Sequence, residues 1–212
     1  EEYYRHRAPE YEEIYYRKDA ICQAELKIAA DFLVRFVEGK TVLELACGTG
    51  YWTEIMSRSA LSITASDMAP EMLTEARKKD YNCSVSFVDA DMFEHSFGEN
   101  CFDVVVLGFW FSHQPRQTYP ALFDVIEKPL KRDGRIWMID NNPSAERSPV
   151  LSKTDEHGNN YRQRNVSNGE SYMILKNYFE RTDLEAIFGS RFTIESLVHQ
   201  QYYWSAVLSM KR

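Results

Sequence analysis

The stretch Val42-Leu43-Glu44-Leu45-Ala46-Cys47-Gly48-Thr49-Gly50 runs from an apolar strand through an acidic residue into a glycine-rich turn. Gly48 and Gly50 let the backbone pass close to a ligand, and we expect a positive φ at Gly48 because glycine adopts that conformation at little steric cost. Residues 51–58 are then expected to form a helix whose first amide groups face the turn. Helix starts of this kind commonly bind phosphate. Glu44 would repel an anion and attract an ammonium group, so the turn suits a zwitterionic amino acid better than a pyrophosphate.

Two further strand ends carry carboxylates at the spacing of a nucleoside site. The apolar residues 62–66 end at Asp67-Met68, 17 residues after Gly50, where α/β nucleotide folds place an acid on the ribose hydroxyls. Residues 84–88 lead into Asp89-Ala90-Asp91-Met92, which offers a carboxylate and a thioether beside an adenine ring. The three strand ends together predict a ligand that joins an amino acid to adenosine.

These motifs, in this order, resemble the first three motifs of the class I S-adenosylmethionine-dependent methyltransferases. Residues 102–113 resemble the family's fourth strand and catalytic loop, and residues 130–135 resemble its later glycine turn. The resemblance is good over residues 41–141 and rests on the order of elements beyond them. Ala46 replaces the family's usual first glycine, and Asp133 replaces the glycine or proline common in the later turn.

The resemblance implies S-adenosyl-L-methionine as cofactor and S-adenosyl-L-homocysteine as product. On this basis we assign a cofactor-binding set: Glu44, Ala46, Gly48, Gly50, Asp67, Met68, Asp89, Ala90, Leu107 and Tyr11. Asp91 is an alternative to Asp89 for the adenine amino group. Acidic residues at strand ends also cap the helices that follow them, so Glu44 and Asp67 have a purely structural alternative.

Apolar periodicity alternates between helix and strand along the chain. We expect helices near residues 20–37, 51–59, 70–79 and 119–130, and strands near residues 41–46, 62–67, 84–89, 103–109 and 135–140. Short apolar strands with helical crossovers predict a parallel sheet covered on both faces. Residues 192–199 and 202–210 are joined too tightly for a crossover and should pair antiparallel. The predicted class is α/β: a Rossmann-like, seven-stranded methyltransferase fold, mostly parallel, with a C-terminal antiparallel hairpin and helices on both faces.

A chain of 212 residues is most simply one domain, here residues 1–212. Two segments stand outside the alternation, an N-terminal cap segment at residues 1–19 and a lid-like insertion at residues 143–177. Within the insertion, residues 160–166 and 171–176 read as a hairpin around Asn168-Gly169. Insertions of this length in compact domains are typical of lids and binding loops. We expect both segments to cover the cofactor and form the acceptor pocket, with acceptor contacts from Tyr4, Trp110 and Arg162.

Composition restricts the partners. The net charge of -7 disfavours binding to nucleic acid, which requires an excess of Lys and Arg. No apolar run in this sequence reaches the ~20 residues of a membrane helix, and the four cysteines show neither a close pairing nor a zinc-ligand spacing. The expectation is a cytoplasmic monomer or homodimer that acts on a small molecule without a metal ion.

Methyl transfer from a sulfonium is a direct displacement, which requires alignment of the reacting atoms and removal of any proton on the nucleophile. His113 is the candidate base because histidine titrates near neutrality and because this residue follows the fourth strand, whose carboxyl end faces the ligand crevice. Residues 112–115, Ser-His-Gln-Pro, also resemble a Ser-His-x-Pro signature in a bacterial branch of small-molecule methyltransferases. The alternative is a histidine that only caps backbone groups. Arg162 alternates with Arg164 on the hairpin strand, in the pattern of either an acidic-acceptor site or a solvated strand face.

The main hypothesis is methylation of a small molecule at oxygen or nitrogen; C-methylation of a small metabolite and a non-catalytic cofactor-binding domain remain alternatives. An NAD-dependent oxidoreductase is disfavoured because Thr53 stands at the third glycine of its fingerprint. Asp140-Asn141 resembles two ligands of the metal-dependent catechol-type enzymes, but residues 107–109 lack the third. Residues 108–111, Gly-Phe-Trp-Phe, also differ from the Asn/Asp-Pro-Pro-aromatic tetrad of enzymes that methylate nucleic-acid amino groups.

Overall fold

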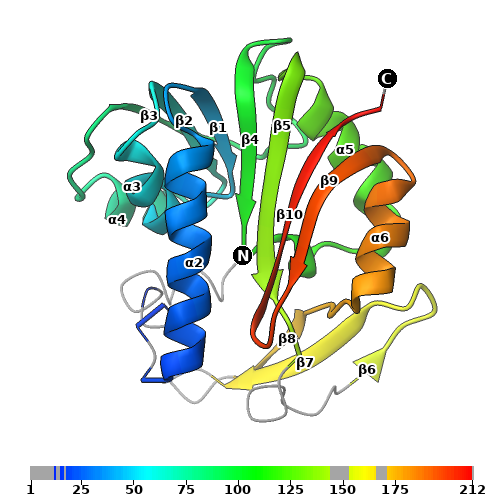
Figure 1. Ribbon diagram of the computed structural model, residues 1–212. Coiled ribbons are helices and arrows are strands. Elements are labelled where there is room, and N and C mark those ends of the chain that lie inside the picture. Colours follow the sequence, from blue (N-terminus) through cyan, green and yellow to red (C-terminus); the bar gives the residue numbers. More distant parts are fainter. Residues whose placement is uncertain (1–11, 13–14, 17, 144–152, 166–170, 212) are drawn as a thin grey trace.

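The computed structural model describes residues 12, 15–16, 18–143, 153–165 and 171–211. Its centre is a seven-stranded sheet of order β3-β2-β1-β4-β5-β10-β9 (Figure 1). Neighbours from β3 to β5 pair in parallel, and β10 pairs antiparallel with both β5 and β9. The predicted fold class, including its C-terminal hairpin, is confirmed. The strands are β1 Thr41–Leu45, β2 Ser62–Asp67, β3 Ser84–Asp89, β4 Phe102–Gly108, β5 Leu130–Asn141, β9 Phe192–His199 and β10 Tyr203–Met210.

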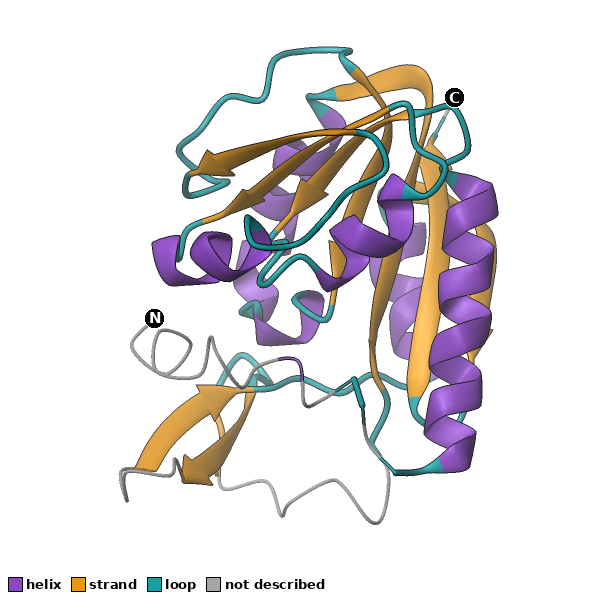
Figure 2. Ribbon diagram, turned by 90° about the vertical axis from the view of Figure 1, so that its left-hand side faces the viewer, coloured by secondary structure: helices purple, strands orange, loops and turns teal. Residues whose placement is uncertain are grey.

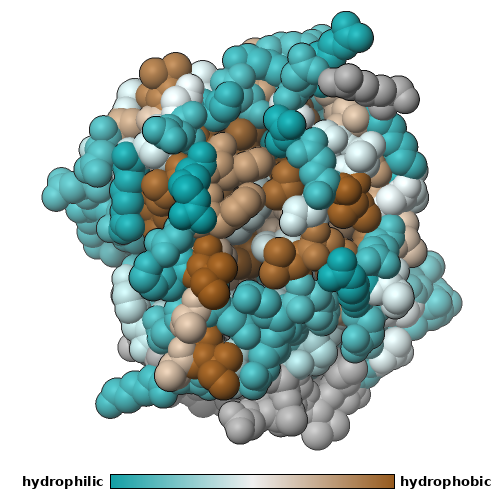
Figure 3. Space-filling model, viewed as in Figure 1, coloured by the Kyte–Doolittle hydropathy of each residue, from teal (hydrophilic) through white to brown (hydrophobic). Residues whose placement is uncertain are grey.

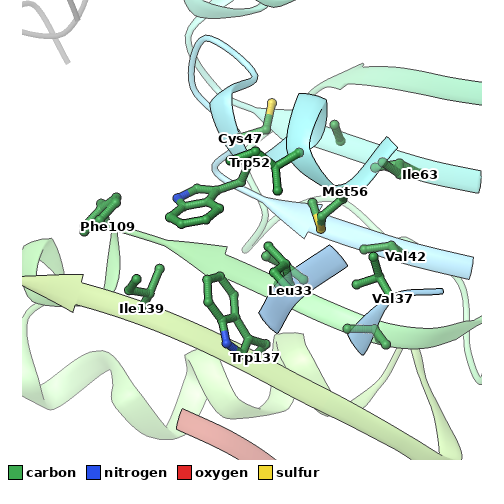
Figure 4. Packing of buried hydrophobic residues seen from close by; sticks show 14 of the residues in the cluster. Leu33, Val37, Val42, Cys47, Trp52, Met56, Ile63, Phe109, Trp137 and Ile139 are labelled. Atoms are coloured by element: carbon green, nitrogen blue, oxygen red, sulfur yellow. The ribbon is translucent and has the colours of Figure 1, made fainter. Parts of the chain in front are cut away.

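Helices cover both faces of this sheet and divide the core in two. In β4, Val104 and Val106 pack on one face and Val105 and Leu107 on the other, as the two-residue repeat of a strand requires. Figure 4 shows the first face, where the Trp52 ring packs between the strands and the helices. The first face is covered by α2 (Ala20–Phe36), α3 (Tyr51–Ser57) and α4 (Pro70–Ala76), and the second by α5 (Tyr119–Glu127) and α6 (Arg181–Gly189).

The helix α2 buries a narrower face than its sequence pattern indicates. Leu26 and Leu33 are buried in the first core, whereas Ile21, Ile28 and Phe32 keep 53%, 57% and 37% of their surface exposed. Asp19 caps the helix by accepting a hydrogen bond from the Cys22 amide at 2.9 Å. Apolar groups are accordingly visible on the molecular surface over this part of the fold (Figure 3).

Other elements differ from their predicted bounds. Helices α3, α4 and α5 end two to three residues earlier than predicted. Strand β5 begins at Leu130 rather than residue 135, because Leu130 pairs with Phe102 before the register shifts. Helix α6 was not predicted. It starts at a capping box between Glu180 and Asp183. Only Leu184 and Phe188 of this helix are buried in the core, and two such positions give a weak periodic signal in the sequence.

The insertion contains a second, antiparallel sheet of order β6-β7-β8, made of β6 Lys153–Thr154, β7 Asn160–Asn165 and β8 Ser171–Leu175. It lies on the side of the molecule where β4 and β5 end (Figures 1 and 2). The two predicted hairpin strands are confirmed, and β6 is an addition. The predicted Asn168-Gly169 turn lies outside the described residues.

Candidate active site

The turn between β1 and α3 has the conformation that its glycines predict. The φ angles of Ala46, Gly48 and Gly50 are 54°, 56° and 82°, all in the left-handed region that favours glycine. A Cβ atom on Gly50 would lie 3.1 Å from the Ala76 Cβ and 2.6 Å from the Tyr81 hydroxyl oxygen. Glycine is therefore required at residue 50 by both conformation and space, whereas Ala46 holds a strained backbone.

Asp67 at the end of β2 faces this turn. Its carboxylate accepts hydrogen bonds from the amides of Gly48 at 2.8 Å and Ala69 at 2.9 Å. Burial raises the pKa of Asp67, although these backbone donors oppose the shift. Each carboxylate oxygen has more than one acceptor direction, so the oriented carboxylate can still accept from a ligand hydroxyl.

Glu44 lies behind the turn with only 1% of its surface exposed. Its Oε2 accepts a hydrogen bond from the Thr53 hydroxyl at 2.5 Å. Burial raises the pKa of Glu44 to about 8, and the negative charge of Asp67 adds to the effect. This carboxyl group is thus largely neutral at pH 7, and an ammonium group brought near it would favour its ionisation.

A cavity of about 310 Å³ opens beside the turn. It collects residues from the carboxyl ends of four parallel strands, the location at which open α/β sheets bind ligands. Its wall combines carboxylates with thioethers and aromatic rings, a composition suited to the hydroxyls and the flat base of a nucleoside. The lining residues are Ala46, Gly48, Ser66, Asp67, Met68, Ala69, Met72, Ala90, Asp91, Met92, Phe93, Gly108, Phe109, Trp110, His113 and Gln114.

The loop after β4 brings His113 to the edge of this cavity. Trp52 packs so closely against Gly108 that a Cβ there would lie 2.4 Å from its ring, and Phe109 has a φ of 56°. The chain then forms the short 3-10 helix η2, Phe111–His113. A close packing contact and a left-handed residue therefore set the direction in which this loop leaves the sheet.

The His113 imidazole is held as a neutral ring. Its Nδ1 lies 2.8 Å from the carbonyl oxygen of Leu175; a carbonyl can only accept, so the proton lies on Nδ1. Its Nε2 lies 3.4 Å from the Lys176 Nζ. Burial and the adjacent Lys176 ammonium lower the pKa of His113 to about 3. At neutral pH this ring therefore carries no charge.

Lys176 joins the insertion to the main sheet through a buried ion pair. Its ammonium donates to Asp140 Oδ1 at 3.0 Å and to the Ser112 hydroxyl at 2.5 Å; the two charged side chains are 4% and 0% exposed. Asp140 also accepts from the Ser112 amide and hydroxyl, both at 2.8 Å. Burial alone would raise the pKa of Asp140, but Lys176 and these donors hold it below its ordinary value.

The described part of the N-terminal segment also contacts the turn. Glu12 accepts a hydrogen bond from the Thr49 hydroxyl at 2.8 Å and pairs with Lys79. Tyr15 stacks on Tyr51 with ring centroids 3.8 Å apart and an interplanar angle of 7°. These contacts lie next to the glycine turn.

A protein-family model described as a methyltransferase domain matches residues 42–134, which include the glycine turn and the four strand ends that line the cavity. This match, together with the likenesses reported next, supports a class I S-adenosylmethionine-dependent methyltransferase.

Relatives of this methyltransferase support the assignment. A demethylmenaquinone methyltransferase of Staphylococcus aureus (strain MRSA252) is 28% identical over 120 residues, which cover 55% of this chain and 48% of that protein. The chain thus spans about half the length of the curated relatives it matches. The solved structure "DhpI-SAH complex structure" is 25% identical, covers 99% of this chain and 94% of its own, and has a TM-score of 0.78.

A third likeness shows the fold alone. It is the Burkholderia thailandensis 1,6-didemethyltoxoflavin-N1-methyltransferase, crystallised with 1,6-didemethyltoxoflavin and S-adenosylhomocysteine. It is 18% identical, with a TM-score of 0.62, and covers 97% of this chain and 87% of its own.

The methyltransferase cavity gathers seven of the residues singled out from sequence: Ala46, Gly48, Asp67, Met68, Ala90, Trp110 and His113. Five others, Arg162 among them, lie outside its lining. Glu44 and Gly50 support the turn, Leu107 is 1% exposed in the core, and Asp89 pairs with Asp67 in the strand register. Asp91 lines the cavity, which favours the alternative to Asp89. Tyr4 and Tyr11 lie outside the described residues.

Sequence reasoning missed Lys176 as a site residue. No local spacing marks it, because its partners Ser112 and Asp140 are 64 and 36 residues away in the chain. The interpretation of residues 160–166 as a solvated strand face is wrong for Arg162, which is only 8% exposed. The Arg164 side chain is outside the described part.

Asp140, one of the two residues that resemble ligands of catechol-type enzymes, has its carboxylate engaged by Lys176 and Ser112. Within the described residues, no group of three or more His, Cys, Asp or Glu side chains is placed to hold a metal ion. None of the described helices has the length and apolar character needed to cross a bilayer.

Proposed function

We propose that this chain binds S-adenosylmethionine in the 310 Å³ cavity and transfers its methyl group to a small-molecule acceptor, at oxygen or nitrogen. One observation supports this most directly: a single cavity is lined by the glycine turn, by the oriented carboxylate of Asp67 and by His113. The first two suit the two halves of the cofactor, and the third stands where an acceptor would meet it.

Different residues would contact different parts of the cofactor. Ala46 and Gly48 bring backbone close to the amino-acid part. Glu44, buried behind them, would act on the ammonium group through its charge once ionised. Asp67 accepts from the ribose hydroxyls, and Asp91 and Met92 flank the adenine. Gly50, Asp89 and Leu107 support this set by holding the turn and strands, and we retain Tyr11 and Tyr4 as cap-segment contacts to cofactor and acceptor.

S-adenosylmethionine supplies a methyl group on a positively charged sulfur, which makes that carbon electrophilic. The chain must orient the acceptor on the opposite side of the methyl group and exclude water. We propose that His113 and Trp110 present the acceptor from the loop after β4. Because the pKa of His113 is about 3, it removes protons poorly at neutral pH, and an acceptor atom that is already ionised or weakly protonated fits this site best.

Calorimetric titration of the protein with S-adenosylmethionine, S-adenosylhomocysteine and NAD, each alone, tests the proposal. We expect micromolar binding of both sulfur ligands and no heat from NAD. An Asp67→Ala variant should bind S-adenosylhomocysteine at least tenfold more weakly, because it loses an acceptor for the ribose hydroxyls. Binding of NAD in place of the sulfur ligands would contradict the proposed function.

A further inference from the structure

Arg162 in β7 is a buried cation. Its side chain is 8% exposed, and one Nη donates to the Tyr178 hydroxyl at 3.1 Å. Its Nε atom is buried and has no hydrogen-bond partner. Buried donors are nearly always satisfied in folded proteins, so this N–H group marks a place where an acceptor atom is needed.

The strand register places Arg162 on the same face of the small sheet as Lys176. Arg162 pairs with Ile174, and the Lys176 amide donates to the Asn160 carbonyl. Directly paired residues share a face, and residues two apart along a strand share it too. Arg162 and Lys176 therefore lie on the same face of the small sheet, the face from which Lys176 reaches Ser112 and Asp140.

The charges on this face do not balance. Asp140 compensates Lys176, and His113 is neutral because its pKa is about 3. Among the described residues, no ion pair joins Arg162 to an acid, and its hydrogen bond goes to a neutral phenol. Its positive charge also contributes to the low pKa of His113. An uncompensated buried charge is costly unless an opposite charge joins it.

We propose that Arg162 binds an oxyanion of the methyl acceptor, so that the acceptor is a small organic acid held on the insertion side of His113. This inference rests on the proposed function, since it names the class of acceptor for the same site. A guanidinium offers two parallel N–H groups to a carboxylate or to a phosphorus or sulfur oxyanion, and the Nε–H of Arg162 supplies one of them. The anion would fix one end of the acceptor while the other meets the methyl group.

The test follows the Arg162 Nε–H resonance by ¹⁵N NMR, with the signal assigned by its absence from an Arg162→Lys variant. Inorganic phosphate and sodium acetate serve as probes, each in the presence and absence of S-adenosylhomocysteine, with sodium chloride at equal ionic strength as the blank. We expect phosphate or acetate to shift this resonance saturably and chloride to leave it in place. The stronger of the two probes identifies the type of oxyanion.

Two variants complete the test. Arg162→Gln should weaken binding of the effective probe at least tenfold and leave S-adenosylhomocysteine binding within twofold of the wild type. Arg181→Gln, at a residue whose side chain is 54% exposed and paired with Glu185, should change neither. If Arg162→Gln does not fold, the shift of the wild-type Nε–H resonance still shows whether Arg162 binds an oxyanion. The absence of a saturable shift with both probes overturns the acid-acceptor inference, whereas failure to bind S-adenosylhomocysteine defeats the proposed function separately.

Discussion

Ala46 stands in a backbone conformation that favours glycine, with a φ of 54°. A left-handed residue other than glycine costs about 1–2 kcal/mol, and replacement by glycine adds up to about 1 kcal/mol of unfolded-state entropy. We therefore predict that Ala46→Gly leaves the free energy of unfolding unchanged or slightly raised. Ala24→Gly, at an exposed position within α2, should lose about 1 kcal/mol. If urea denaturation showed that the two variants lose the same unfolding free energy, the backbone at residue 46 would not be strained.

The buried carboxyl group of Glu44 predicts a pH dependence. Its pKa of about 8 in the folded chain lies above its ordinary value of 4.5, so the unfolded state ionises first as pH rises. The wild type should lose about 1.4 kcal/mol of unfolding free energy per pH unit between these values, relative to Glu44→Gln. Below pH 4.5 the two proteins should respond to pH alike. Urea denaturation of both proteins at pH 5, 6.5 and 8 measures the difference. If the unfolding free energies of the two proteins changed in parallel with pH, Glu44 would be ionised in the folded chain.

His113 is the candidate catalytic residue, and its role can be separated from its contribution to folding. Once an acceptor is identified, His113→Ala should lower turnover at least tenfold, because the ring that positions the acceptor is lost, and should leave the affinity for S-adenosylhomocysteine unchanged. His95→Ala, at an exposed position, is the matched control. Unchanged turnover in His113→Ala would remove His113 from the mechanism and leave it as the group that binds the Leu175 carbonyl.

At the scale of elements, a buried ion pair between Lys176, just after β8, and Asp140 in β5 contributes to the contact between the small sheet and the main sheet. Removing Lys176 leaves the Asp140 carboxylate buried without its cation, a change that costs about 3–5 kcal/mol. Lys176→Met should therefore destabilise the chain by about that amount, measured by urea unfolding. It should also raise the pKa of His113, because a neighbouring positive charge is gone; NMR titration of the imidazole would show it.

A double variant supplies the control for this prediction. In Lys176→Met/Asp140→Asn the uncompensated charge is absent, so part of the lost stability should return. A double variant no more stable than Lys176→Met would mean that the loss comes from packing and not from charge.

The elements of the sheet were predictable because each strand is a short apolar run that ends in a turn or an acid. The glycine turn, Asp67 and the loop before His113 were predictable for the same reason, because each directly follows such a strand in the sequence. Helix α6 and the Lys176 contacts did not, for different reasons. The helix has a weak apolar period with two buried positions, and the ion pair joins parts of the chain that only the tertiary fold brings together. Burial of Arg162 likewise depends on the packing of the small sheet.

At the scale of the whole molecule, cofactor binding should stabilise the fold. A ligand at a hundred times its Kd adds about 2.7 kcal/mol, which corresponds to roughly 5–10 °C in Tm for a chain of this size. We predict a rise of that order with S-adenosylhomocysteine and none with NAD at equal concentration. Differential scanning fluorimetry measures both. Equal shifts from the two ligands would contradict a selective cofactor site.

The small sheet is attached to the loop after β4 at several points. The amide of Asn177 donates to the Ser112 carbonyl at 2.7 Å, and the Arg116 amide donates to the Asn159 side chain at 2.8 Å. Grafting the insertion of a relative onto this scaffold, in order to change which acceptor is methylated, would therefore fail if residues 143–177 alone were exchanged. A working chimera would also need the donor's counterparts of residues 112–116 and of Asp140. The segments that must be exchanged together are therefore not contiguous in the sequence.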